Sequence, residues 1–266
     1  MKTRILSAIV AFLIFIPIFI IGGFIFNVSI YILMILGIRE FMKARESKTK
    51  FPDFIRLIVY LMITILYFEC TINGNLTLSF NYKIISGICL TLFLPVVLYH
   101  EEKVYNIEDA FYLVGGVFFL GFSMSLFNMY RSLGLELIIF LFLITITTDS
   151  YAYFIGKLIG RHKLLETISP NKTWEGTIGG SLISSFICTI YYITVINFNS
   201  SIVLVSIIVL FLSLIGQFGD LFFSAIKRRY KIKDFSNIMP GHGGILDRLD
   251  SIIFVMLAFT FFINIL

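Results

Sequence analysis

Two long stretches without a charged residue limit what this chain can fold into. They cover residues 5–38 and 176–219. A helix that crosses a bilayer needs about 20 apolar residues, so each stretch is long enough for two spans. Gly22 and Gly23 interrupt the first stretch near its middle, and residues 197–200 form a natural turn in the second. Each stretch therefore predicts a pair of membrane helices.

The composition supports this interpretation. Of the 266 residues, 58% are hydrophobic and 14% are charged, whereas soluble domains carry about 25% charged residues. So few charges cannot cover a soluble surface, and a chain this apolar does not stay disordered. Further charge-poor runs are residues 57–68, 84–100, 110–130, 137–148 and 251–266. We therefore predict an all-α, polytopic integral membrane protein with about nine transmembrane helices.

The basic residues predict the orientation of these helices. With a cytoplasmic N-terminus, nine spans leave these segments inside: 1–4, 39–56, 100–109, 149–175 and 221–250. They carry 19 of the 21 lysines and arginines, which is the asymmetry that the positive-inside rule describes. Lys2 and Arg4 before an apolar run resemble a signal peptide, but without a convincing cleavage site we expect an uncleaved first helix. Any chemistry is therefore expected at the cytoplasmic face.

Net charge and cysteine content exclude other classes of function. The net charge of +5 is interpreted as a topology signal, so no nucleic-acid partner is expected. The three cysteines are far apart and form no CxxC motif. They indicate neither a disulfide framework nor a zinc site.

A polar stripe marks the helix that ends in the basic run. At 100° per residue, five polar side chains fall within an arc of about 80°. Asp220 precedes Lys227 by seven residues, so it lies roughly 10 Å deeper along the helix. A carboxylate at that depth is costly unless it is paired, metal-bound or hydrated, which makes it a functional-site hypothesis. The alternative is a pair with lysine or arginine that joins two helices. The stripe comprises Ser213, Gln217, Asp220, Ser224 and Lys227.

The segment 227–233 contains five basic residues in seven positions. The simpler interpretation is a cytoplasmic segment that contacts anionic lipid. The more specific one is a binding site for phosphate groups. Its position beside the polar stripe favours the phosphate site.

A glycine-rich turn follows and leads into the last helix. Three glycines surround His242, and glycine-rich turns before a helix suit anions. Asp247 and Asp250 follow at i, i+3 and share one face if the helix begins there. The alternatives are a plain turn and simple helix capping. The three glycines are Gly241, Gly243 and Gly244.

A second polar cluster begins at Asp149 and includes residues 169–176. Pro170 suits a turn or a first helical position. Trp174 is the only tryptophan, and an interfacial position is its simplest role. Lys172 and Glu175 have the i, i+3 spacing of a surface pair.

Carboxylates beside a dense basic run suit one kind of chemistry. Mg²⁺ prefers one or two carboxylates together with substrate phosphate oxygens. Phosphoryl-type transfer needs mainly positioning and charge neutralisation. A phosphate monoester has a second pKa near 6, so it is already an ionised nucleophile at neutral pH.

Residues 224–250 carry a resemblance. SAIKR, then KD, then PGHGGILDRLD resemble, in order and spacing, the signature of the phosphatidate cytidylyltransferases, or CDP-diacylglycerol synthases. Met239 stands where leucine, isoleucine or phenylalanine is expected. Residues 149–156 and 169–176 also resemble that family. We therefore divide the chain into residues 1–140, about five generic transmembrane helices, and residues 141–266, the catalytic helices with a cytoplasmic-face active site.

The resemblance implies that CTP and phosphatidate give CDP-diacylglycerol and pyrophosphate, with Mg²⁺. It implies Asp220 and Asp247 as metal ligands. We assign catalytic roles to Asp220, Asp247, Lys227, Arg228 and Lys172. We assign substrate binding to Ser224, Lys233, His242, Gly243, Gly244, Arg248 and Asp250.

The expected setting is a bacterial plasma membrane, with phosphatidate held in the bilayer. The resemblance also leaves open that the protein forms a homodimer. Two rival functions remain: a CTP-dependent enzyme that acts on another lipid, and a transporter or channel. A transporter predicts polar residues that continue to the outer face, whereas the stripe stops near Ser213.

Overall fold

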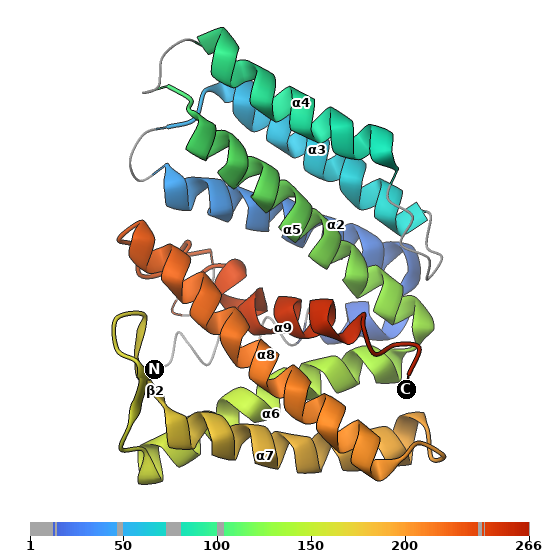
Figure 1. Ribbon diagram of the computed structural model, residues 1–266. Helices are drawn as coiled ribbons and strands as arrows, with labels where there is room; N and C mark the ends of the chain where they lie inside the picture. Colours follow the sequence, from blue (N-terminus) through green and yellow to red (C-terminus); the bar gives the residue numbers. More distant parts are fainter. Residues whose placement is uncertain are drawn as a thin grey trace. The chain divides into compact units, whose positions relative to one another are not determined.

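The computed structural model describes residues 13, 15–46, 50–72, 81–99, 104–238, 241 and 243–265 (Figure 1). Within these residues it is built from the α-helices α2 (Gly23–Arg45), α3 (Asp53–Ile72), α4 (Tyr82–Tyr99), α5 (Ile107–Leu133), α6 (Leu135–Ile159), α7 (Trp174–Tyr191), α8 (Ile202–Arg229) and α9 (Leu246–Phe259). The predicted helical class is confirmed.

Each predicted charge-poor run that the structure describes coincides with a helix, and the helices extend into charged flanks. Seven of the described helices are long and apolar enough to cross a membrane. Large apolar side chains remain exposed along them, among them Phe24, Phe111 and Phe186, as lipid-facing residues do. The chain is therefore a polytopic membrane protein. The first predicted span lies largely outside the described residues, and α9 has 14 residues.

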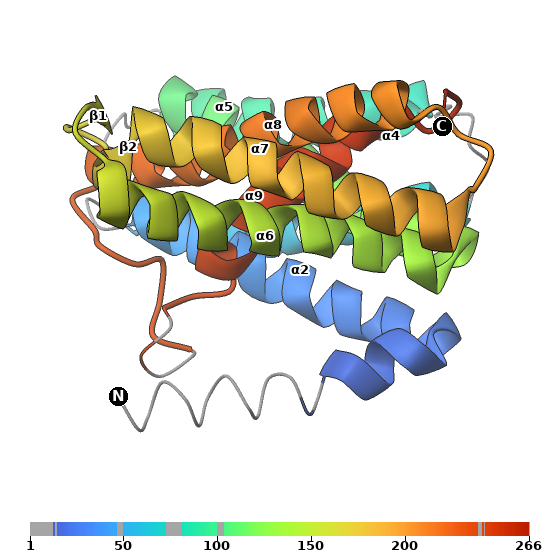
Figure 2. The same cartoon turned by 90° about the horizontal axis from the view of Figure 1, so that it is seen from below.

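The two breaks that the sequence predicted are present. Gly22 has φ 67° and ψ −152°, a conformation that favours glycine. It separates the helical residues 15–21 from α2 (Figure 2). In the second stretch, α7 passes into a π-helix over Tyr192–Ile196 before the turn that leads to α8.

The described chain forms two compact units. The first unit is Met1–Ser132 together with Asp234–Leu246, and the second is Leu133–Lys233 together with Asp247–Leu266. Helices α2 to α5 belong to the first unit, together with the glycine-rich turn. Helices α6 to α8 and nearly all of α9 belong to the second.

Large side chains and a closed ion pair hold the first unit together. Phe41 of α2 stacks on Tyr112 of α5 with ring centroids 4.2 Å apart. Arg45 forms a two-bond pair with Asp109 at 2.5 Å, and both residues are buried. Its guanidinium also lies 5.0 Å from the centre of the Phe51 ring.

Small residues bring α6 and α7 of the second unit together, and Figure 2 shows the two helices side by side. A Cβ atom on Gly180 would lie 2.7 Å from the backbone nitrogen of Ala152, and one on Gly176 would lie 3.1 Å from the Cα of Gly156. Ala152 and Gly156 are four residues apart, as are Gly176 and Gly180. This spacing of small residues allows close backbone approach between membrane helices.

Helix α8 packs against α7 through Ser213 and Gln217, the first two residues of the polar stripe. Gln217 donates from Nε2 to the carbonyl of Thr177 at 3.2 Å and to the Ser181 hydroxyl at 2.8 Å. Ser213 donates to the same Ser181 hydroxyl at 2.9 Å. Ser213 and Gln217 therefore join helices, which gives no support to the cation pathway that a transporter needs.

A short hairpin between α6 and α7 was not predicted. Strand β1 (Lys163–Leu165) pairs with β2 (Ser169–Thr173) in antiparallel fashion. Pro170 lies in β2 and not in a turn or at a helix start, so that expectation was wrong; its carbonyl accepts a hydrogen bond from Lys163 Nζ at 2.7 Å. Thr173 ends the hairpin and caps α7, because its Oγ1 accepts from the Gly176 N–H at 3.2 Å.

Candidate active site

The hairpin brings a lysine to the carboxylate of the polar stripe. Lys172 of β2 donates from Nζ to Asp220 Oδ2 of α8 at 2.6 Å. The same Nζ lies 3.3 Å from the carbonyl of Gln217. Ser224, one turn after Asp220, donates to its Oδ1 at 3.4 Å. Three residues that the sequence predicted as site residues, Lys172, Asp220 and Ser224, are thus in direct contact.

A second pair joins the end of α8 to the start of α9. Lys227 Nζ donates to Asp247 Oδ1 at 2.7 Å, and the two side chains are 11% and 4% exposed. Helix α9 begins at Leu246, which confirms the helix start that was expected before Asp247. Asp250 follows three residues after Asp247 on the same helix, as its second acidic residue.

Asp149 and Asp250 connect the two pairs. Asp149 interacts electrostatically with Lys172 and Asp220. Asp250 interacts with Asp220, Lys227 and Asp149. We call these six residues the charge cluster: Asp149, Lys172, Asp220, Lys227, Asp247 and Asp250. Its four carboxyl groups outnumber its two ammonium groups by two.

Asp149 is a member of the cluster that the sequence analysis did not assign to the site. It lies in the membrane helix α6, and its neighbouring carboxylate in that helix is Glu136 at the opposite end. An isolated intramembrane carboxylate is a functional-site signal by default. The depth argument that made Asp220 a candidate would therefore also have made Asp149 a candidate site residue.

The basic run after Ser224 divides into a buried and an exposed part. Lys227 is buried in its pair, whereas Arg228 and Lys233 are exposed. Arg228 donates from Nε to the carbonyl of Ile168, in the hairpin loop, at 3.3 Å. Arg248 is exposed on the first turn of α9. These exposed cations are accessible to a phosphate-bearing ligand.

Two simpler interpretations concerned ion pairs: a pair of Lys172 with Glu175, which is wrong, and a pair of Asp220 with a lysine or arginine, which is observed. Lys172 does not pair with Glu175, because Glu175 lies 2.6 Å from His162 Nδ1 and accepts from the N–H of Arg161. The pairing that was the alternative for Asp220 is present. However, a pair that only joins two elements needs one carboxylate for each lysine, and the charge cluster contains two more.

The glycine-rich turn has the backbone that the sequence suggested. Gly241 and Gly243 have φ values of 79° and 85°, in the left-handed region that favours glycine. Gly243 and Gly244 are buried. His242 lies outside the described residues, so its assigned role stays a prediction.

The donors of the charge cluster fit Mg²⁺, which takes carboxylate and phosphate oxygens. Among the described residues, no three carboxylate, imidazole or thiol groups converge into a ready-made metal site. An ion held by one or two aspartates therefore needs further oxygens from its substrate, as Mg²⁺ usually does.

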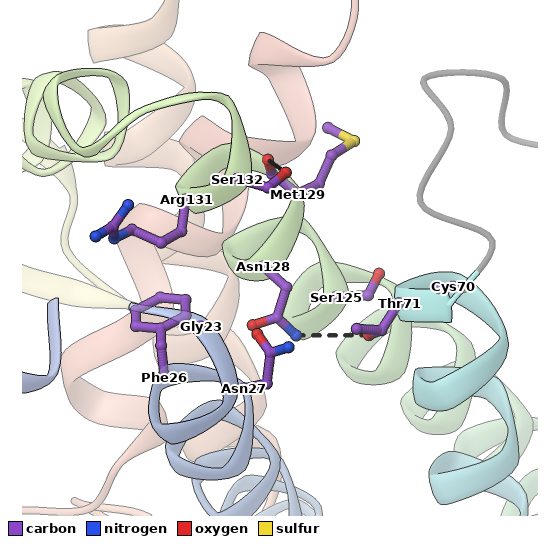
Figure 3. Close-up of a pocket in the computed structure, with 10 residues that line it drawn as sticks. All are labelled: Gly23, Phe26, Asn27, Cys70, Thr71, Ser125, Asn128, Met129, Arg131 and Ser132. Atoms are coloured by element: carbon purple, nitrogen blue, oxygen red, sulfur yellow. Dashed lines mark hydrogen bonds between the residues drawn. The ribbon is translucent and has the colours of Figure 1, made fainter. Parts of the chain in front are cut away.

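The first unit contains a cavity of about 330 Å³ that none of the predicted site residues lines (Figure 3). Asn128 lies in its wall and donates to the hydroxyls of Tyr67 at 2.6 Å and Thr71 at 3.5 Å. Arg131, also in the wall, donates to the carbonyls of Phe19 and Ile20. Because no predicted site residue lines it, the cavity is not the candidate site.

Comparison with known proteins identifies the family. The model of the "Cytidylyltransferase family" matches residues 2–266. A "Phosphatidate cytidylyltransferase" of Staphylococcus haemolyticus is 37% identical over 256 residues, which cover 96% of each chain. Proteins with the same name from Staphylococcus saprophyticus and Staphylococcus aureus are 36% and 35% identical over 257 residues, again 96% of each chain. The chain belongs to the cytidylyltransferase family.

Proposed function

We propose that this protein is a phosphatidate cytidylyltransferase. It transfers the cytidylyl group of CTP to phosphatidate and produces CDP-diacylglycerol and pyrophosphate. The observation that carries the proposal is the charge cluster, in which Lys172 pairs with Asp220 and Lys227 pairs with Asp247. Full-length similarity to proteins with that name supports the same reaction.

Asp220 and Asp247 are the residues that would hold Mg²⁺. Bound there, the ion would neutralise negative charge on the triphosphate. The excess of carboxyl groups in the charge cluster supports this assignment, because the cluster offers more carboxyl oxygens than its two lysines pair with. Asp250 and Asp149 would support the metal ligands or add to them.

The protein's own cations handle the remaining charge. Lys172 and Lys227 are already oriented by their aspartates, so little side-chain freedom is lost when phosphates arrive. Arg228, Lys233 and Arg248 are exposed and bind phosphate oxygens of CTP or phosphatidate. Arginine suits this role because its planar group forms two parallel hydrogen bonds.

The bond changes are simple. An ionised oxygen of the phosphatidate phosphate attacks the α-phosphorus of CTP, and the bond from that phosphorus to the bridging oxygen breaks. Pyrophosphate leaves with the electron pair. No side chain needs to remove a proton from the nucleophile, because its second pKa lies near 6.

The lipid tails stay in the bilayer while the headgroup meets CTP at the cytoplasmic face. This explains why charged residues are tolerated at the end of a membrane helix. The relatives are bacterial, which supports a bacterial plasma membrane. Residues 141–266 supply the proposed catalytic side chains, and a homodimer is consistent with the family resemblance.

The direct test is pyrophosphate release by detergent-purified protein with CTP, phosphatidate and Mg²⁺. Release is expected only when all three are present, together with CDP-diacylglycerol. Asp220→Asn and Asp247→Asn should each abolish it. Asp53→Asn is the matched control, because Asp53 is 95% exposed and pairs only with Arg56 among the described residues.

Different failures separate the parts of the proposal. Activity that survives both aspartate substitutions would keep the reaction and reject the metal ligands. No release with phosphatidate, but release with a polyprenol or another lipid, would assign the chain to a different CTP-dependent reaction. Ion flux in the absence of either reaction would favour the transporter.

A further inference from the structure

Glu40 is a buried carboxylate that the sequence analysis did not single out. It lies near the end of α2 and is 1% exposed. Its partners are neutral: the Ser236 hydroxyl and the Ile245 N–H donate to Oε1, the latter at 3.0 Å, and the Leu246 N–H donates to Oε2 at 2.9 Å. In the part of the chain that the structure describes, no lysine or arginine pairs with it. A buried carboxylate without a cation is costly, so its position needs an explanation.

The explanation lies at the start of α9. Leu246 is the first residue of that helix, and the first N–H groups of a helix lack partners inside it. The same end carries the positive side of the helix dipole. A serine or aspartate of the local sequence usually caps this end. Here Glu40 does so from a helix about 200 residues away in the chain.

Two glycines make room for this contact. A Cβ atom on Gly244 would lie 2.6 and 2.7 Å from the two carboxylate oxygens of Glu40. A Cβ atom on Gly37, one turn earlier in α2, would lie 3.3 Å from the Leu246 side chain. Leu246 itself is fully buried. The last glycine of the turn is therefore explained by close approach to Glu40.

We propose that Glu40 is a positioning residue for cytidylyl transfer. Through the N–H groups of Ile245 and Leu246 it fixes the end of the glycine-rich turn, and thereby the placement of Asp247, the next residue in the chain. The proposal rests on the proposed function, since Asp247 acts there. It also assigns these two N–H groups to Glu40 and not to a substrate phosphate, which leaves substrate phosphates to the cationic side chains.

Glu40→Gln is the first test. Glutamine keeps the size, but its NH₂ group faces a backbone donor, so one of the two bonds to the turn is lost. We expect kcat to fall about 10- to 100-fold, the cost of a misplaced catalytic group. The KM for CTP should change less than about threefold, because the substrate contacts themselves remain. Glu40→Asp keeps the charge but shortens the reach, so its kcat should lie between those of Glu40→Gln and the wild type.

The matched control is Glu46→Gln. Glu46 follows α2 directly and pairs with Arg56 at 2.9 Å, but it does not contact the glycine-rich turn among the described residues. Its replacement should leave kcat unchanged. If both glutamine variants lose kcat equally, the effect belongs to the end of α2 in general and the proposal is overturned.

Amide hydrogen exchange supplies a readout that is independent of the reaction. Exchange at Ile245 and Leu246 should be at least about tenfold faster in Glu40→Gln than in the wild type, because their acceptor is weakened. It should be unchanged in Glu46→Gln. If Glu40→Gln does not fold, Gly244→Ala serves instead, since the new methyl group displaces the carboxylate and should accelerate the same two amides.

The outcomes separate this proposal from the proposed function. Wild-type kcat and wild-type exchange in Glu40→Gln would overturn it, as would a loss of activity fully explained by a smaller folded fraction. If the wild type does not use phosphatidate, the proposed function fails. Exchange at the two amides, together with kcat on the lipid that is used, then still decides the role of Glu40.

Discussion

The two units each place aspartates beside cations, but they do so in different ways. In the first unit, both oxygens of Asp109 bind Arg45, and Oδ2 also accepts the Asn106 N–H at 3.3 Å. One guanidinium thus matches one carboxylate. In the second unit, two lysines face four carboxylates. A buried ion pair is weak evidence for function by itself. The comparison indicates that an excess of carboxyl groups over cations marks the site, whereas a one-to-one pair marks the scaffold.

Asp247→Asn should give the largest effect on activity. The substitution removes a charge from the cluster and leaves the volume unchanged. We expect turnover to fall on the order of 10³-fold, or about 4 kcal/mol of barrier, as for the loss of a central electrostatic group. Pyrophosphate release at saturating CTP measures it. The comparison breaks if activity survives while the thermal stability of the purified protein falls.

Asp109→Asn should have the opposite profile. It leaves the buried Arg45 without its anion, and breaking a buried pair costs about 3 kcal/mol of unfolding free energy or more. Activity per folded molecule should stay within about twofold, since Asp109 lies outside the charge cluster. Denaturant unfolding in detergent measures the loss. A stable variant with lost turnover would contradict the structural role of this pair.

The helices and the main charged residues could be predicted from the sequence, because both depend on local rules. A membrane helix needs only a long apolar run, and the glycine at position 22 was enough to predict the break before α2. Asp220 and Lys227 lie on one helix, so their spacing fixes their common face. Their partners could not be derived in this way. Lys172 reaches Asp220 only through an unpredicted hairpin, and its i, i+3 neighbour Glu175 was the wrong partner.

Glu40 and Asp149 also show that tertiary partners cannot be derived from local sequence. Glu40 lies on a helix without a motif, whereas Asp149 begins a segment that resembles the family; for neither residue does the sequence give the partners. Glu40 gains its role from a turn about 200 residues away, and Asp149 gains its role from α8 and β2. Such contacts depend on tertiary packing, which no periodicity within one helix reports. The assignment of residues 1–140 as generic helices follows from this limit.

Gly180→Ala and Gly115→Ala compare helix packing in the two units, and their expected effects on the unfolding free energy are the smallest of these predictions. Both glycines lie inside membrane helices, and alanine is the better helix former by about 1 kcal/mol. The surroundings differ. A methyl group on Gly180 of α7 would lie 2.7 to 2.8 Å from the backbone and Cβ of Ala152 in α6. One on Gly115 of α5 would meet no atom within 4 Å outside its own stretch of helix, among the residues that the structure describes.

We therefore expect opposite signs. Gly180→Ala should cost about 1–3 kcal/mol of unfolding free energy, because overpacking forces α6 and α7 apart. Gly115→Ala should be neutral or stabilising by up to about 1 kcal/mol. Denaturant midpoints in the same detergent measure both. Because α6 carries Asp149 and α7 follows directly on the strand that carries Lys172, Gly180→Ala should also lower turnover of the folded enzyme. Equal midpoints for the two variants would mean that small residues do not set the distance between α6 and α7, and the contrast between the units would then rest on charge alone.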